Sequence, residues 1–136
     1  MAGKVVSDST GGGNYFKPAD GMYLMEFVGM EETTHNVYQS DEQEPAWRWK
    51  FKMYDFITKQ PVIDPETNDQ AIYQDRTKQS LHIQSNGYKR TSALLRRDPV
   101  VGETEEALFA ALPGTKCFGT FSKGWLKGVV RTPEGF

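Results

Sequence analysis

The sequence predicts a single all-β domain of five strands, with one or two short helices between the third and fourth strands. Three observations favour this fold class, and the length of 136 residues fits one domain. Apolar and basic residues alternate one by one from Trp47 to Met53, which is the period of a strand half buried in a sheet. Glycine and proline recur between the apolar segments, where turns are needed. The segments with helical character lie together, within 87–112.

The first two strands are predicted over 21–29 and 46–56. The 21–29 segment is apolar on both faces, as in a strand inside a sheet. One face of the 46–56 segment carries side chains that we expect in the core, because large apolar side chains are usually buried: Trp47, Trp49, Phe51 and Met53. The opposite face carries Arg48, Lys50, Lys52 and Tyr54. Between the two strands, the acidic segment 31–45 is expected to be a solvated loop or an irregular hairpin.

A third strand is predicted over 76–85, after a long loop at 57–75 that contains a short pairing at 71–73. Its even positions carry a second polar and basic row, which includes Arg76, Lys78 and His82. Two such strands side by side would present one contiguous basic face. The alternative interpretation is an ordinary solvated surface, on which lysines also discourage edge-to-edge association.

Two helices and two strands complete the predicted order. The first helix, 87–97, stops at Asp98-Pro99, and the second, 103–112, has acids near its N-terminus that favour the positive end of the helix dipole. A fourth strand is predicted over 115–122 and a fifth over 125–131, with a tight turn between them at Lys123-Gly124. The glycine-rich segment 1–14 is expected to be a disordered arm before a domain over 15–132, and 133–136 a short tail.

The net charge of −2 conceals segregated blocks of charge. Residues 20–44 hold seven acids and no bases, residues 76–97 hold six bases and no acids, and residues 116–131 hold four bases and no acids. If the fold gathers the basic blocks on one side, a local positive field follows despite the total. A single cysteine excludes an internal disulfide, and no apolar run approaches the roughly 18 residues of a membrane span. We therefore expect a cytoplasmic protein with no membrane partner.

No recognisable catalytic or metal-binding pattern is present. The sequence has no glycine-rich phosphate loop, no nucleophile elbow and no paired catalytic carboxylates, so we expect neither an enzyme nor a cofactor. A nuclease would need clustered carboxylates, whereas the acids here are scattered over loops. Neither His35 nor His82 has a second ligand at zinc spacing, and the segment 64–75 lacks the glycine of a calcium loop, so no metal is expected.

Three strands, a helical connection and two further strands are the element order of an OB-fold. The run Leu-Pro-Gly-Thr-Lys-Cys-Phe-Gly-Thr-Phe at 112–121 is similar to the passage from helix to fourth strand in such domains. From 15 to 132 the chain resembles small phage-encoded single-stranded-DNA-binding proteins. The resemblance implies a five-stranded, partly open barrel that binds single-stranded DNA with little sequence preference in DNA replication or recombination. It also implies replication or recombination proteins as further partners, and the host cytoplasm as location.

In that family the ligand lies across strands two and three. The matching positions in this chain are Arg48, Lys50, Lys52, Tyr54, Arg76, Lys78 and His82. Further candidates are Lys89 and Arg90 as phosphate contacts beside the groove, Trp125 as a stacking ring, and Lys127. The basic pairs of the first helix have an ordinary alternative interpretation as solvated charge. The alternative function is a protein-interaction or scaffold module with no nucleic-acid role, whose partner surface would be the acidic block 20–44.

Overall fold

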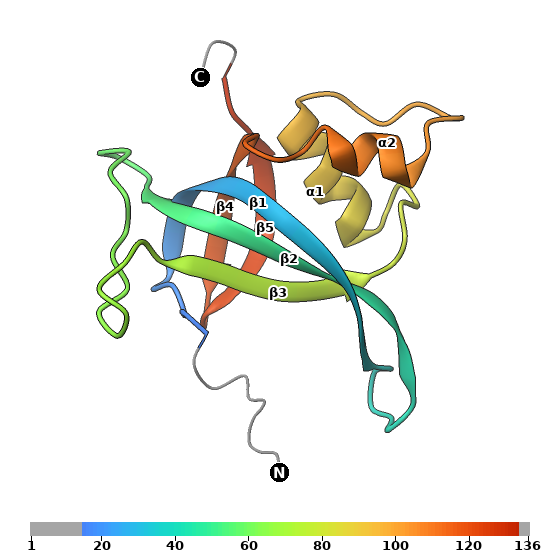
Figure 1. Cartoon of the computed structure of the whole chain (residues 1–136), viewed down its shortest axis with the longest axis horizontal. Coiled ribbons are helices and arrows are strands. Elements are labelled where there is room, and N and C mark those ends of the chain that lie inside the picture. The colour runs from blue at the N-terminus through green and yellow to red at the C-terminus, as the bar shows by residue number, and fades with distance from the viewer. Residues whose placement is uncertain (1–14, 134–136) are drawn as a thin grey trace.

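All five strands belong to one antiparallel sheet in the order β3-β2-β1-β4-β5, as the computed structural model shows for the described residues, 15–133 (Figure 1). The predicted arm 1–14 and residues 134–136 of the predicted tail lie outside this range. The strands are β1 (Gly21–Asn36), β2 (Gln43–Asp55), β3 (Ile72–Lys78), β4 (Lys116–Ser122) and β5 (Trp125–Arg131). Two short helices, α1 (Asn86–Leu95) and α2 (Glu105–Ala110), connect β3 to β4.

The sheet forms an open barrel in which β1 is the central strand and pairs with both β2 and β4. The edge strands β3 and β5 share no ladder among the described residues, but they meet where the backbone N–H of Leu126 donates to the hydroxyl of Tyr73 at 2.9 Å. The predicted fold class, an all-β sheet in a partly open OB-type arrangement, is confirmed. Neither described helix is long and apolar enough to cross a membrane.

Strand β1 is longer than the predicted 21–29 segment. Of the two forms expected for 31–45, the irregular hairpin is present, because β1 and β2 pair as far as Asn36 and Gln43. The register shifts between Phe27 and Gly29, which marks a β-bulge. A bulge moves the following side chains to the opposite face, so the apolar alternation of the first half does not continue into the second. Beyond the bulge, polar residues pair across the hairpin, and His35 lies opposite Glu44 with 2.8 Å between imidazole Nε2 and carboxylate Oε1.

Strand β3 lies earlier in the chain than predicted. It begins at Ile72, inside the segment expected to be loop, because Ile72 and Tyr73 pair with Lys52 and Phe51 of β2. The strand ends at Lys78, not at residue 85. His82 therefore lies in the connection to α1 and not on the strand, which corrects the prediction for that residue.

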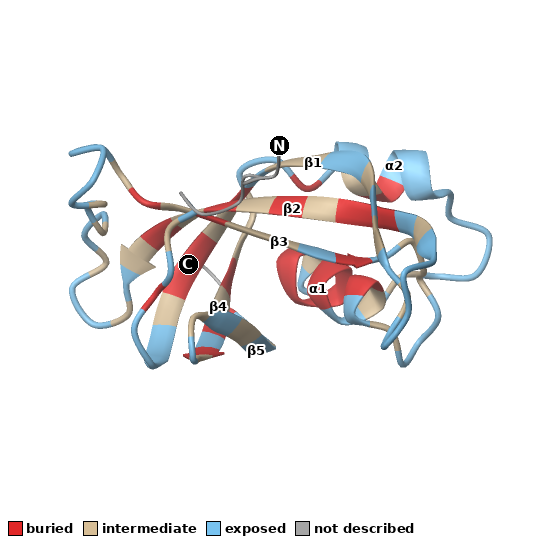
Figure 2. Ribbon diagram, turned by 90° about the horizontal axis from the view of Figure 1, so that it is seen from below, coloured by how far each residue is buried: buried red, intermediate tan, exposed pale blue. Residues whose placement is uncertain are grey.

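The core fills the inner face of the barrel. Trp47, Trp49, Phe51 and Met53 are buried as predicted, and buried and partly exposed residues alternate along β2 (Figure 2). The buried indole N–H of Trp49 donates to the Thr77 hydroxyl at 2.8 Å, which satisfies a polar group inside the core. Cys117 is also buried, and burial raises the pKa of its thiol to about 12.

Helix α1 covers one end of the barrel. Ser85 caps its N-terminus by accepting a hydrogen bond from the backbone N–H of Tyr88 at 3.1 Å. Gly87 in the first turn has no space for a side chain, since a Cβ there would meet the carbonyl oxygen of Ser80 and lie 3.1 Å from the Trp47 ring. Thr104 caps α2 in the same way, and both predicted helices are present, with the second shorter than expected.

Candidate nucleic-acid interface

Six of the predicted site residues lie on one surface of β2 and β3, five of them within the ladder between these strands and Tyr54 just beyond its end. We call this surface the outer face; it consists of Arg48, Lys50, Lys52, Tyr54, Arg76 and Lys78. Arg48 lies directly opposite Arg76, and Lys78 lies opposite Ala46, two pairs further along the same ladder and therefore on the same face. The neighbouring inward residues Trp47, Trp49 and Phe51 are buried, so the basic row and the core occupy opposite sides of the same strand.

Two carboxylates from β1 reach this face. Glu31 lies opposite Arg48 and pairs with it at 3.8 Å and with the Lys50 ammonium at 3.1 Å. Glu26 accepts a hydrogen bond from the Tyr54 hydroxyl at 2.8 Å, and this bond is the main reason that the pKa of Tyr54 is raised. The acidic block of the sequence thus lies partly against the basic one.

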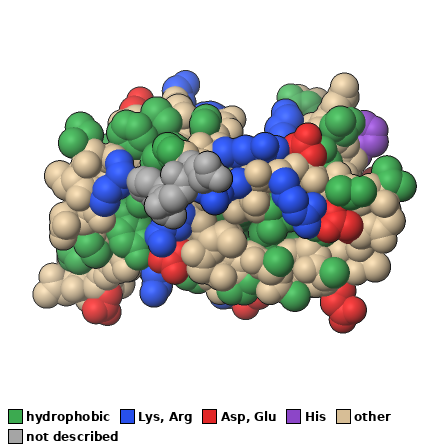
Figure 3. Space-filling view, turned by 90° about the horizontal axis from the view of Figure 1, so that it is seen from above, with side chains coloured by type: hydrophobic (Ala, Val, Ile, Leu, Met, Phe, Trp, Pro, Cys, Tyr) green, Lys and Arg blue, Asp and Glu red, His purple; other side chains and the backbone are tan. Residues whose placement is uncertain are grey.

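Three cations of the outer face, Lys52, Arg76 and Lys78, make no ion pair with any described residue. The Arg76 guanidinium instead donates to the backbone carbonyl of Thr34 at 2.9 Å, which holds it beside the β1–β2 hairpin. Viewed from above the orientation of Figure 1, Lys and Arg side chains gather in the middle of the molecule, and acidic side chains lie beside only some of them (Figure 3). A positive surface therefore survives despite the negative total charge.

Tyr15 joins the outer face, although the sequence analysis did not single it out as a ligand-binding residue. The Arg48 guanidinium carbon lies 6.0 Å from the centre of the Tyr15 ring, and the tyrosine is 39% exposed. An aromatic residue shortly before the first strand was the only available signal, because the approach of 15 to 48 depends on the course of the folded chain.

Arg90 does not belong to any exposed basic surface, which corrects the prediction. Its side chain is 7% exposed, and its two terminal nitrogens contact both carboxylate oxygens of Asp75, whose side chain is 8% exposed, at 2.5 and 2.7 Å. The guanidinium also lies 5.4 Å from the centre of the Trp49 ring. Asp75 Oδ2 accepts a further hydrogen bond from the Tyr73 hydroxyl at 2.8 Å. The positive charge of Arg90 is therefore enclosed and neutralised within the structure.

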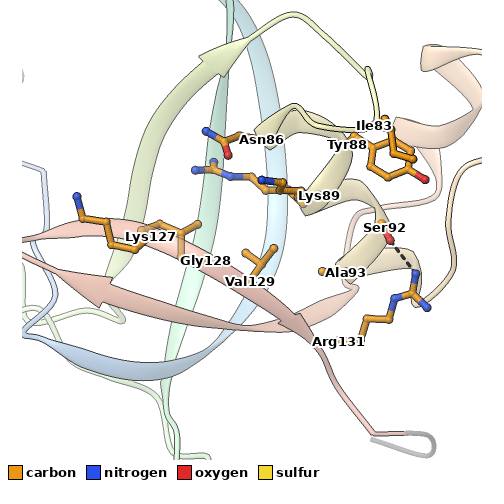
Figure 4. Close-up of a pocket in the computed structure, with 12 residues that line it drawn as sticks. Ile83, Asn86, Tyr88, Lys89, Ser92, Ala93, Lys127, Gly128, Val129 and Arg131 are labelled. Carbon is orange, nitrogen blue, oxygen red and sulfur yellow. Dashed lines mark hydrogen bonds between the residues drawn. The ribbon is translucent and has the colours of Figure 1, made fainter.

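The remaining predicted residues lie around the open side of the barrel. A groove between α1 and β5, with a volume of about 570 Å³, includes Lys89 and Lys127 among its lining residues (Figure 4). Trp125 begins β5 and is 52% exposed, next to the groove residue Leu126. His82 is exposed in the β3–α1 connection and joins neither surface. The structure therefore places six of the predicted residues on the outer face and Lys89, Arg90 and Lys127 in the lining of the groove, with Trp125 beside the groove and His82 apart from both.

No group of three or more histidine, cysteine, aspartate or glutamate side chains within residues 15–133 is arranged to hold a metal ion. Comparison of the chain with protein-family models, with curated proteins and with solved structures gives no significant match.

Proposed function

We propose that this protein binds single-stranded DNA with little sequence preference, in DNA replication or recombination. The observation that carries the proposal is the β2–β3 register, which sets five cations side by side on the outer face, with Tyr54 two residues after Lys52 on the same face of β2. Lysine and arginine side chains in such a row neutralise successive phosphates and release their counterions. Tyrosine rings beside the row stack on bases, and stacking tolerates any base because every base has a π-face.

The arrangement favours contacts to the nucleic-acid backbone over reading of particular bases. Phosphate contacts fix a strand in place but carry no sequence information. Three of the five outer-face cations are lysines, which act as flexible point charges and not as planar forks that match one base edge. If about five phosphates are neutralised, the logarithm of affinity falls with the logarithm of salt concentration with a slope near −3.5, at about −0.7 per phosphate.

The first test removes two outer-face charges. The double variant Lys50→Gln, Lys52→Gln is expected to flatten the salt slope for a fluorescent oligo-dT by about 1.4. Its matched control is Lys123→Gln, which removes an exposed lysine in the β4–β5 turn, outside both surfaces. Fluorescence anisotropy over a series of salt concentrations measures the affinity and the salt slope of the double variant and of the control. Equal slopes in the double variant and the wild type would exclude the two lysines from the binding surface.

The ion pairs of Glu31 provide a test in the opposite direction. Glu31 contacts Arg48 at 3.8 Å and Lys50 at 3.1 Å. A DNA strand bound to the outer face must therefore compete with Glu31 for these two cations. We expect Glu31→Gln to raise the affinity for oligo-dT at low salt, because it frees both cations. An affinity that stays the same or falls would contradict binding at this position.

Stacking is tested separately at Tyr54. We expect Tyr54→Ala to weaken binding while leaving the salt slope nearly unchanged, because the ring contributes no charge that displaces counterions. Tyr54→Phe is the matched control, since it keeps the ring and removes only the hydroxyl that donates to Glu26. Equal affinities for the alanine variant and the wild type would remove Tyr54 from the interface.

One observation favours a second candidate, a protein-interaction module. The β1–β2 hairpin ends in a turn where Tyr38 is 86% exposed, close to the exposed acids Asp41 and Glu42. An exposed ring among acids suits a basic protein partner. Wild-type protein that leaves oligo-dT unbound at low salt would favour this candidate over DNA binding.

A further inference from the structure

The groove between α1 and β5 contains a pattern of charge that the outer face does not explain. Four cations and no carboxylate line it, among them Lys89 on α1 and Lys127 on β5. Arg90 is neutralised by Asp75, and Arg131 donates to Asp98 at 2.6 Å and to Ser92 at 2.8 Å. Lys89 and Lys127 make no ion pair with any residue in 15–133. The groove therefore has a positive charge that no described acid neutralises.

Apolar side chains also line the groove, from both the helix and the strand. Ala93 of α1, which is buried, and Leu126 and Val129 of β5, which are partly buried, are among the lining residues, and Val129 projects into the space toward the helix (Figure 4). Asn86, in the first turn of α1, adds an exposed amide with both a donor and an acceptor. The volume of about 570 Å³ falls in the usual range of small-molecule sites. Two cations beside an apolar slot and one amide suit a phosphate joined to a flat ring.

The groove is close to the outer face in the fold. Asp75 holds the groove residue Arg90, and the next residue, Arg76, belongs to the outer face. β3 is an edge strand with no described ladder partner on the side away from β2. A single strand that leaves the outer face at Arg76 therefore enters the groove by crossing one strand edge.

We propose that the groove holds one nucleotide of the bound single strand, with its phosphate on Lys89 and Lys127 and its base against Ala93, Leu126 and Val129. This proposal rests on the proposed function and extends the bound strand beyond the outer face. An acidic peptide would also satisfy the two lysines, but the apolar slot and the single amide favour a base.

The charge of the groove is tested with the double variant Lys89→Gln, Lys127→Gln and the control Lys123→Gln. Affinity is measured for oligo-dT of about 4–16 nucleotides, the range of sites on one OB domain. For the longer strands we expect the double variant to flatten the salt slope by about 1.4. Between about 50 and 200 mM salt, the wild type then loses about sevenfold more affinity than the double variant does. For the shortest strands that bind, we expect no difference, because they occupy the outer face alone.

The base is tested by NMR of the Ala93 and Val129 methyl groups in the full chain. A base beside them shifts their signals on titration with oligo-dT, whereas an abasic strand of equal length leaves the signals largely unmoved. Equal shifts with the abasic strand, or no shift, would overturn the placement of the base. Shifts with an oligoglutamate peptide but none with oligo-dT would overturn it in favour of an acidic peptide.

The failure of this proposal is distinguishable from failure of the proposed function. An unchanged slope in Lys89→Gln, Lys127→Gln, alongside a flattened slope in Lys50→Gln, Lys52→Gln, overturns the groove and leaves the outer face as the binding surface. Absence of wild-type binding to every oligo-dT overturns both proposals. Equal flattening at all strand lengths would mean that the groove lysines bind the strand without an ordered path, and would also overturn the proposal.

Discussion

Removal of the Arg90 guanidinium is expected to lower the free energy of unfolding more than removal of almost any other single charge. The Arg90 and Asp75 side chains are 7% and 8% exposed and are joined by two contacts of 2.5 and 2.7 Å. In Arg90→Met, the Asp75 carboxylate stays buried and keeps only the Tyr73 hydroxyl, at 2.8 Å, among its described side-chain partners. A methionine fills much of the vacated space beside Trp49, so the loss is mainly electrostatic.

The expected loss of stability in Arg90→Met follows from the burial of both Arg90 and Asp75. Breaking a buried ion pair by removing one member costs about 3–5 kcal/mol, since the other charge is left without compensation. For a chain of this size, such a loss lowers Tm by about 10 °C or more. The double variant Asp75→Asn, Arg90→Met leaves no buried charge, and its amide can still accept from Tyr73. We therefore expect the double variant to be more stable than Arg90→Met alone.

Urea unfolding, followed by the fluorescence of the buried Trp47 and Trp49, measures these free energies. The matched control is Arg96→Met, which removes an exposed arginine at the end of the same helix and should change stability little. The reasoning is refuted if Arg90→Met unfolds within about 1 kcal/mol of wild type, or if the double variant is less stable than the single one. At a temperature where Arg90→Met is folded, its salt slope for oligo-dT should equal that of wild type, because Arg90 is enclosed.

Three further predictions concern single sites. Gly87→Ala is expected to destabilise the fold by about 1–3 kcal/mol in urea unfolding, because the new methyl group clashes with the Ser80 carbonyl. Hydrogen bonds from Arg97 and the Val100 amide lower the pKa of Glu103 to about 2, so the stability that this carboxylate contributes is complete above its ordinary pKa and is lost as pH falls toward 2. In Glu103→Gln, the free energy of unfolding should therefore fall less over that pH range than in the wild type. A pKa near 4 for Glu103, measured by NMR, would contradict this. Cys117 should resist a thiol reagent at pH 8 in the folded protein and react in denaturant, since burial keeps its thiol protonated; fast reaction without denaturant would disprove it.

The sequence predicted the outer face better than it predicted the elements around it. Alternation from Trp47 to Tyr54 correctly separated core from surface, because the side-chain period of a strand is two and one face was uniformly apolar. The same reasoning placed β3 too late and put His82 on it. In that segment polar residues occupy both parities, so no apolar row fixed where pairing with β2 begins.

The β-bulge near Val28 shows a second limit. One extra residue reverses the face of everything that follows, and the sequence carries no clear mark of it. The sequence therefore left both a loop and an irregular hairpin open for the second half of β1, which pairs with β2 along its whole length. The groove could not be predicted from the sequence either, because Lys89 and Lys127 come from a helix and a strand whose approach depends on how the barrel closes.

By itself, the sequence determined the all-β class, the number of strands and their order along the chain, and the basic row of β2, because local alternation and turn residues encode them. Only the tertiary structure decided which of the basic side chains remain available to a ligand. Arg90 and Lys89 are neighbours in the chain, yet Arg90 is enclosed against Asp75 and Lys89 lines an open groove. The physical reason is that the solvation and pairing of a charge depend on residues far away in sequence, which come together only when the chain folds.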